Sequence, residues 1–221
     1  MNVSDGLISF EAALLGWISL GVLLGFCTAK APWRALWQSS VRQNLSVGSG
    51  VFLLLLWLFH ADALPGLSLH FFGLTAVTLV IGWQLALLVS TLAVLMLAGI
   101  NHAGFAAVGW AVWGMVVPPI VITTWVNRCA QRCLPPNFFI YLFVNVFFAA
   151  ILGFIAAALA SAGLMSALGI YPWPVLVDSY LALLPIQVIP EAMMNGMVML
   201  GLTLLRPDWV ISFDDRRYFK N

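Results

Sequence analysis

The chain has 221 residues, of which 63% are hydrophobic and only 8% are charged, and its net charge is +1 at pH 7. A water-soluble domain of this length needs many more charged side chains on its surface, so the composition excludes a soluble protein and predicts an integral membrane protein. The near-neutral charge, without a basic stripe, argues against binding to nucleic acid.

The apolar runs are long and continuous, which predicts membrane-spanning helices rather than the alternating strands of a barrel. A helix needs about 20 mostly apolar residues to cross a bilayer. Five clear spans follow in chain order: 8–29, 46–62, 105–127, 137–162 and 179–205. We interpret the start of the chain as a retained terminus and not a signal peptide. The sequence predicts a single all-α transmembrane domain, residues 1–221.

The apolar stretch from Leu67 to Gly99 is too long for one span. As one helix it would measure roughly 50 Å, whereas the hydrocarbon core is about 30 Å thick. It contains Gly82 followed by Trp83, a flexible residue and then an aromatic residue that favours the membrane interface. We therefore predict two short helices divided at Gly82, and a total of about seven spans.

The positions of the cationic residues predict the orientation of the chain, because lysine and arginine are retained on the cytoplasmic side of a membrane. All nine fall in three patches: Lys30, Arg34 and Arg42; Arg128 and Arg132; and Arg206, Arg216, Arg217 and Lys220. Seven spans with the N-terminus outside place all three patches inside, whereas six spans would divide them. We expect the C-terminus inside, in the cytoplasmic (inner) membrane of a bacterium.

The three histidines, His60, His70 and His102, lie outside these patches and should gather at the outer side. Imidazole is a good ligand for Ni, Zn, Cu and Fe. A polar group at a helix end is the simpler interpretation of His60. A functional role is favoured for His70 and His102, because each lies where a short or broken helix meets a loop.

Other polar groups are candidate accessory ligands. The amine of Met1, with Asp5 close behind it, is a possible ligand, although a frayed terminus is the simpler alternative. Glu191 lies within a span, with Asn195 one helical turn later, so a polar face points into the bundle. The sequence is equally consistent with a Glu191 that supports a metal site and with one that only ties helices together.

The remaining sequence signals are those of packing, and no enzyme motif is present. Cys27, Cys129 and Cys133 lie at predicted inner ends, where packing is favoured over a soft-metal site. Gly21 and Gly25 are spaced for close contact between helices, as are Gly153, Ala157 and Ser161. The sequence has no HExxH, GxSxG or Walker A pattern, so ATP-driven transport would need a separate ATPase.

Several short stretches carry a resemblance to a known family. They are Met1 to Gly6; Ser68-Leu69-His70; Gly82-Trp83; Asn101 to Gly104; Leu184-Pro185; Glu191; and Arg206-Pro207-Asp208. In order and spacing they resemble the CbiM/NikM family, the substrate-capture membrane subunits of energy-coupling factor transporters for cobalt and nickel. The resemblance implies a pair of cytoplasmic ATPase subunits and a coupling membrane subunit as partners.

The resemblance also implies a metal site built from the Met1 amine, the backbone nitrogen and side chain of residue 2, and His70. A square-planar nitrogen set of that kind favours Ni(II) or Cu(II). Position 2 is Asn2, however, where the family has histidine, so one imidazole is missing. Either His60 or His102 substitutes, or the metal differs, or metal capture has been lost.

We therefore expect an uptake subunit that binds a divalent transition metal, Ni or Co with Zn or Cu possible, at its outer face. Met1, His70 and His102 would be ligands; Asn2 and His60 complete the candidate set, and Asp5, Glu191 and Asn195 would support it. The alternative is a non-transporting member that serves as partner or assembly factor of another membrane complex. An intramembrane enzyme has little support, since no nucleophile–base pair is visible.

Overall fold

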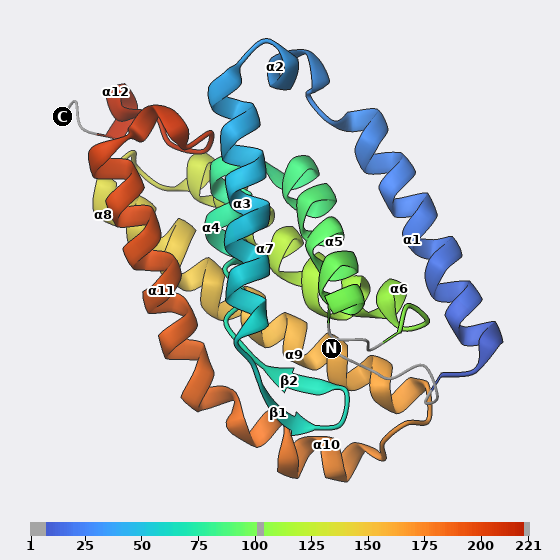
Figure 1. Ribbon diagram of the computed structural model, residues 1–221. Coiled ribbons are helices and arrows are strands. Elements are labelled where there is room, and N and C mark those ends of the chain that lie inside the picture. Colours follow the sequence, from blue (N-terminus) through green and yellow to red (C-terminus); the bar gives the residue numbers. More distant parts are fainter. Residues whose placement is uncertain (1–7, 101–103, 219–221) are drawn as a thin grey trace.

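A computed structural model describes residues 8–100 and 104–218 (Figure 1). Its helices of four or more residues, kinked or interrupted in places, are α1 (Phe10–Lys30), α2 (Trp33–Trp37), α3 (Ser40–Leu58), α4 (Leu74–Ile81), α5 (Trp83–Ile100), α6 (Val108–Ala111), α7 (Val117–Cys133), α9 (Ala149–Ala167), α10 (Trp173–Ser179), α11 (Leu184–Leu205) and α12 (Asp215–Tyr218). A π-helical segment, Val112–Val116, joins α6 to α7, and another, Tyr141–Phe148, joins the short α8 (Phe138–Ile140) to α9. Strands β1 (Ala61–Leu64) and β2 (Leu67–Leu69) form an antiparallel hairpin.

The all-α transmembrane bundle is confirmed. Within the described part of the chain, six continuous helices are long and apolar enough to cross a membrane: 10–30, 40–58, 83–100, 108–133, 138–167 and 173–205. The second begins six residues before the predicted span 46–62 and ends before it. The reason is that the Ser39 hydroxyl accepts a hydrogen bond from the Arg42 N–H and caps the helix there.

The predicted break at Gly82 is also confirmed. Gly82 has a φ of 83°, a left-handed conformation that glycine adopts without a steric penalty, and it separates α4 from α5. The segment does not begin as a helix, contrary to the prediction, because Leu67–Leu69 pairs with β1 across a turn at Gly66. The eight residues of α4, about 12 Å long, are all buried. The count of seven spans and the orientation of the termini stay predictions.

The segments that carry the described cations meet at one end of the bundle, around α2, α8 and α12 (Figure 1). The Gln84 side chain donates to the Lys30 carbonyl there, and the Ser212 N–H donates to the Leu79 carbonyl. The hairpin, α6 and α10 lie at the opposite end (Figure 1), where His60 precedes β1 and His70 follows β2. The separation of cations from these two histidines is therefore present in the fold.

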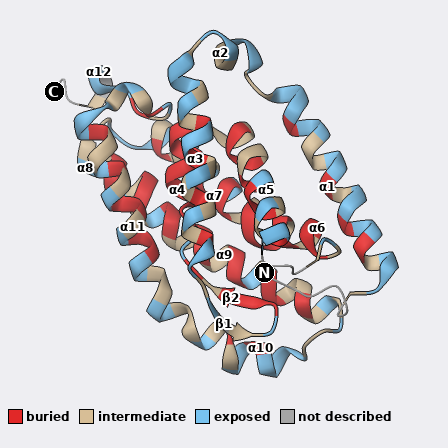
Figure 2. Cartoon of the chain, viewed as in Figure 1, coloured by how far each residue is buried: buried red, intermediate tan, exposed pale blue. Residues whose placement is uncertain are grey.

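The buried residues concentrate on α4, α5 and α9 and on the π-helical segment Val112–Val116, whereas α1 is largely exposed (Figure 2). Helix α1 meets α6 where Gly109 faces the backbone of Gly16, and a Cβ at Gly109 would collide with it. The predicted ridge on α9 does pack, since a Cβ at Gly153 would lie 3.1 Å from Pro119 Cα. The internal contact predicted for Gly21 and Gly25 is wrong, because a Cβ at either would meet no atom of the described residues within 4 Å, and docking of a partner at this face stays untested.

Candidate metal centre

His70 lies in the extended segment between β2 and α4, and only 7% of it is exposed. Its ring packs beside those of Trp57 and Phe72, with centroids 6.1 and 5.1 Å away. Its Nδ1 lies 3.1 Å from the Phe71 carbonyl oxygen. A carbonyl can only accept a hydrogen bond, so Nδ1 carries the proton and Nε2 keeps a lone pair that can bind a metal.

His60 has the same arrangement on the other side of the hairpin. Its Nδ1 lies 3.3 Å from the Trp57 carbonyl oxygen, so this ring too donates from Nδ1 and presents Nε2 as a ligand atom. The Trp57 side chain is fully buried and donates from its indole nitrogen to the Phe72 carbonyl at 3.1 Å. Trp57 thus links the end of α3 to the segment that carries His70. Metal-binding histidines commonly donate from one ring nitrogen to a backbone carbonyl, as His60 and His70 do, and this bond holds the ring in place.

A small cavity of about 30 Å³ brings the two imidazoles together. Its wall is formed by Trp57, His60, Ser68, His70, Val94, Leu97, Ala98, Ala107, Val108, Ala111 and Met115. The volume suits a single ion or water molecule and not an organic ligand. Ser68 was not predicted as a candidate, although residues two apart in a strand share a face and Ser68 precedes His70 by two.

Burial lowers the pKa of His70 to about 3. A shielded imidazole loses the hydration that would stabilise its charged form, so the ring is neutral at physiological pH. Only the neutral ring can bind a metal, and protons therefore do not compete for Nε2 of His70 near pH 7.

Glu191 and Asn195 form the buried cap of α4. The Glu191 carboxylate accepts from the backbone N–H groups of Phe72, at 2.8 Å, and Gly73, at 3.0 Å. The Asn195 side-chain oxygen accepts from the Ala76 N–H at 2.8 Å. Helix starts leave N–H groups unpaired, and these two side chains satisfy them where water cannot. Glu191 therefore ties α11 to α4 and fixes the backbone two and three residues after His70.

Other predicted site residues contribute less or cannot be placed. Met1, Asn2, Asp5 and His102 lie outside the described residues, so their roles stay predictions. Within residues 8–100 and 104–218, no three His, Cys, Asp or Glu side chains cluster as a metal site. Cys27 is buried as a free thiol, as packing predicts, but Cys133 is exposed and the packing role predicted for it is wrong.

The model of the CbiM family, described as the cobalt uptake substrate-specific transmembrane region, matches residues 2–209. This chain belongs to the CbiM family. The family is one of metal transport and not of enzymes, so the CbiM-family assignment agrees with the sequence prediction on both points.

Solved structures share the fold of this CbiM-family chain. A crystal structure of a truncated transition metal transporter matches with a TM-score of 0.74 and 19% identity, over 92% of this chain and 99% of that one. A crystal structure of a transition metal transporter matches with a TM-score of 0.76 and 18% identity, over 93% of each chain. No curated protein matches the sequence.

Proposed function

We propose that this CbiM-family protein is the substrate-binding membrane subunit of an energy-coupling factor transporter and captures a divalent transition-metal ion at its outer face. The observation that carries the proposal is the small cavity shared by His60 and His70. In each ring Nδ1 lies beside a backbone carbonyl, which leaves Nε2 as the nitrogen that can bind a metal, and both residues line the cavity. Nitrogen ligands of this type suit Ni(II), Co(II), Zn(II) and Cu(II).

In this proposal His60 supplies the imidazole that Asn2 lacks. Family members use a histidine at position 2, and an amide is a much poorer ligand for these metals. The Met1 amine and His102 would complete the set, with Asp5 and the Glu191–Asn195 cap in support. The buried cap holds the backbone after His70 and so limits the freedom of the ring.

The outer location rests on the distribution of charge. The described cations gather at the end of the bundle opposite the hairpin, and cationic loops are retained on the cytoplasmic side. The His60–His70 cavity at the hairpin end then faces the outside. Two cytoplasmic ATPase subunits and a coupling membrane subunit would supply the energy, as in the family.

Equilibrium metal binding to purified protein with a native, untagged N-terminus tests this function. We expect wild type to bind one Ni²⁺ or Co²⁺, and we expect His70→Ala and His60→Ala each to weaken binding by about 10-fold or more. Cys133 is a potential metal ligand at the cationic end of the bundle. The variant Cys133→Ser is therefore the matched control and should bind the metal ion as tightly as wild type. The proposal fails if wild type binds no Ni²⁺, Co²⁺ or Zn²⁺, or if His70→Ala binds them equally well.

Asn2 favours a second candidate, a non-transporting member that acts as partner or assembly factor of another membrane complex. Purification of the protein from its native membrane separates the two. Recovery with an ATPase pair supports transport, whereas recovery with an unrelated complex and without metal supports the second function.

A further inference from the structure

Two adjoining cavities lie at the cationic end of the bundle, away from the two histidines. The first, about 380 Å³, is lined by α3, α4, α11 and the turn Pro207–Trp209 and is open on one side. The second, about 260 Å³, shares Val41, Leu45, Val80 and Trp209 with it. Ligand sites typically measure about 300–1,000 Å³, so the first cavity reaches that range by itself and the second extends it.

Small residues create the larger cavity, which we call the α3–α11 groove. Gly48 and Ser49 on α3 line it together with Ala76 on α4, and a Cβ at Gly48 would meet no atom of the described chain within 4 Å. The wall is otherwise mainly apolar, with Phe52 on α3 and Leu202 on α11. Gly48 is itself exposed, so the groove is reached from the side of the bundle that faces lipid.

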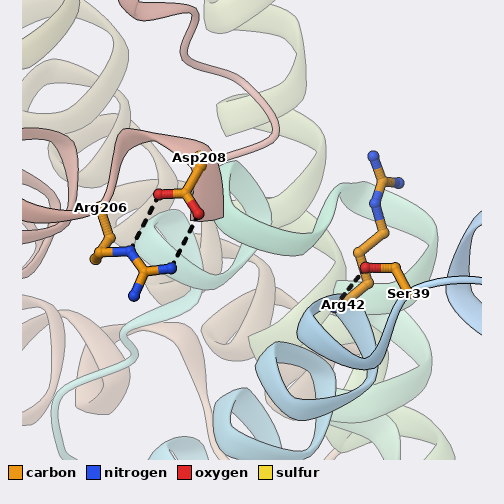
Figure 3. A network of polar contacts seen from close by, with 4 residues as sticks. All are labelled: Ser39, Arg42, Arg206 and Asp208. Atoms are coloured by element: carbon orange, nitrogen blue, oxygen red, sulfur yellow. Dashed lines mark hydrogen bonds and ion pairs between the residues drawn. The ribbon is translucent and has the colours of Figure 1, made fainter.

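Arg206 and Trp209 line the α3–α11 groove at its cationic end, and Arg42 lines the adjoining second cavity; Figure 3 shows the two arginines. Arg206 donates from Nε and Nη2 to the Asp208 carboxylate at 3.2 and 3.1 Å, and its guanidinium lies 4.4 Å from the centre of the Trp209 ring. Arg42, which lines the second cavity, forms no ion pair with any described residue. The Trp209 indole N–H is shielded from solvent and has no acceptor in the described part of the chain.

The charged side chains beside the two cavities favour a ligand with a negative charge. Arg42 and Arg206 outweigh Asp208 by one positive charge, and Asp208 pairs with Arg206, so Arg42 carries the charge that is left without a partner among the described residues. The same pair raises the pKa of Arg206 and lowers that of Asp208, so both stay charged near neutral pH. Guanidinium groups match the geometry of phosphate oxygens, and basic pockets between membrane helices bind phospholipid headgroups.

We propose that the α3–α11 groove binds one anionic phospholipid, with an acyl chain in the groove and the phosphate in the adjoining second cavity, on Arg42 and the Trp209 indole. A zwitterionic lipid binds less well, because its ammonium group would lie beside Arg42. The site is independent of metal capture, since it lies at the other end of the bundle.

Native mass spectrometry of delipidated protein with phosphatidylglycerol or phosphatidylcholine of identical acyl chains tests the proposal. We expect wild type to bind phosphatidylglycerol about 10-fold more tightly, a difference of about 1.4 kcal/mol. Arg42→Gln should reduce that preference several-fold, whereas Arg132→Gln, an exposed arginine at the same end, should not. Free glycerol phosphate should not compete, because it lacks the acyl chain.

Gly48→Leu tests the groove itself. The new side chain enters open space, so the fold and metal binding should be unchanged, while binding of both lipids falls about 10-fold or more. Gly25→Leu is the matched control, because this glycine is also helical and exposed, and a Cβ there would meet no atom among the residues that the structure describes. Equal binding of the two lipids by wild type, or unchanged lipid binding by Gly48→Leu, overturns the proposal. Loss of a copurifying membrane subunit from Gly48→Leu, with lipid binding retained, would assign the groove to a partner's helix instead.

Discussion

The Asn195 side chain donates from Nδ2 to Oε1 of Glu191 at 2.7 Å. The two residues lie one turn apart on α11, and together they bind three backbone N–H groups at the start of α4. The residues of this short helix are all buried, so these side chains supply the acceptors that water supplies at an exposed helix start. The candidate metal centre is attached to this cap through the segment from His70 to Gly73.

We expect Glu191→Gln to lower the free energy of unfolding by about 1–3 kcal/mol, because an amide has one oxygen and must turn its NH₂ group toward a backbone donor. Thermal unfolding in detergent measures the loss. Glu11→Gln, an exposed carboxylate on α1, should change stability little. Unchanged stability in Glu191→Gln would show that the carboxylate is not needed as a cap.

Asn195→Leu should cost about 1–3 kcal/mol, since the Ala76 N–H is left without an acceptor. In the double variant with Glu191→Gln the two losses should not add, because the residues contact one another. A double-mutant cycle on unfolding free energies measures the coupling, which we expect to be about 0.5–3 kcal/mol. Simple additivity would mean that the two residues act separately.

The metal-free protein should lose stability as the pH falls below about 6.5. Below that pH a histidine in the unfolded chain takes up a proton, whereas buried His70 in the folded protein, with a pKa of about 3, does not. The unfolded state then binds more protons than the folded state. The free energy of unfolding should therefore fall by about 1.4 kcal/mol per pH unit, and by about 2 kcal/mol in total at pH 5.

Comparison with His70→Gln isolates this effect, because the carboxylates titrate in both proteins. The groups that share cavities with His70 are His60 and Glu191, and both are kept in the variant. Unfolding midpoints at pH 7 and pH 5 should fall further in wild type than in His70→Gln. An equal fall in both would show that His70 is protonated in the folded protein.

Gly109→Ala should destabilise the protein by about 2–3 kcal/mol and loosen α1, because the new methyl group meets the Gly16 backbone, which cannot move like a flexible side chain. Gly21→Ala on α1 is the matched control. It enters open space and should be neutral or stabilising by up to about 1 kcal/mol, since alanine favours helices. Protease sensitivity at the ends of α1 and thermal unfolding report the two effects. Equal behaviour of both variants would contradict the close contact.

The sequence located most of the helices and the break between α4 and α5, because these depend on the local run of apolar residues and on Gly82. It missed the β-hairpin, since Leu67–Leu69 is as apolar as a helix and only the pairing with β1 makes it a strand. It also placed Gly21 and Gly25 in a contact. The spacing of small residues shows which helix face could pack, and not whether a neighbouring helix lies there.

By itself the sequence determined a membrane-spanning helical protein, and it predicted the described cations at one end and His60 and His70 at the other, because length, hydropathy and charge are properties of each stretch of chain. The tertiary structure alone decided that His60 and His70 share one small cavity. It also decided that Glu191 caps a helix that begins more than 100 residues earlier, with the carboxylate and the Phe72 N–H separated by 119 positions. Contacts across such distances arise only from packing, which no local pattern encodes.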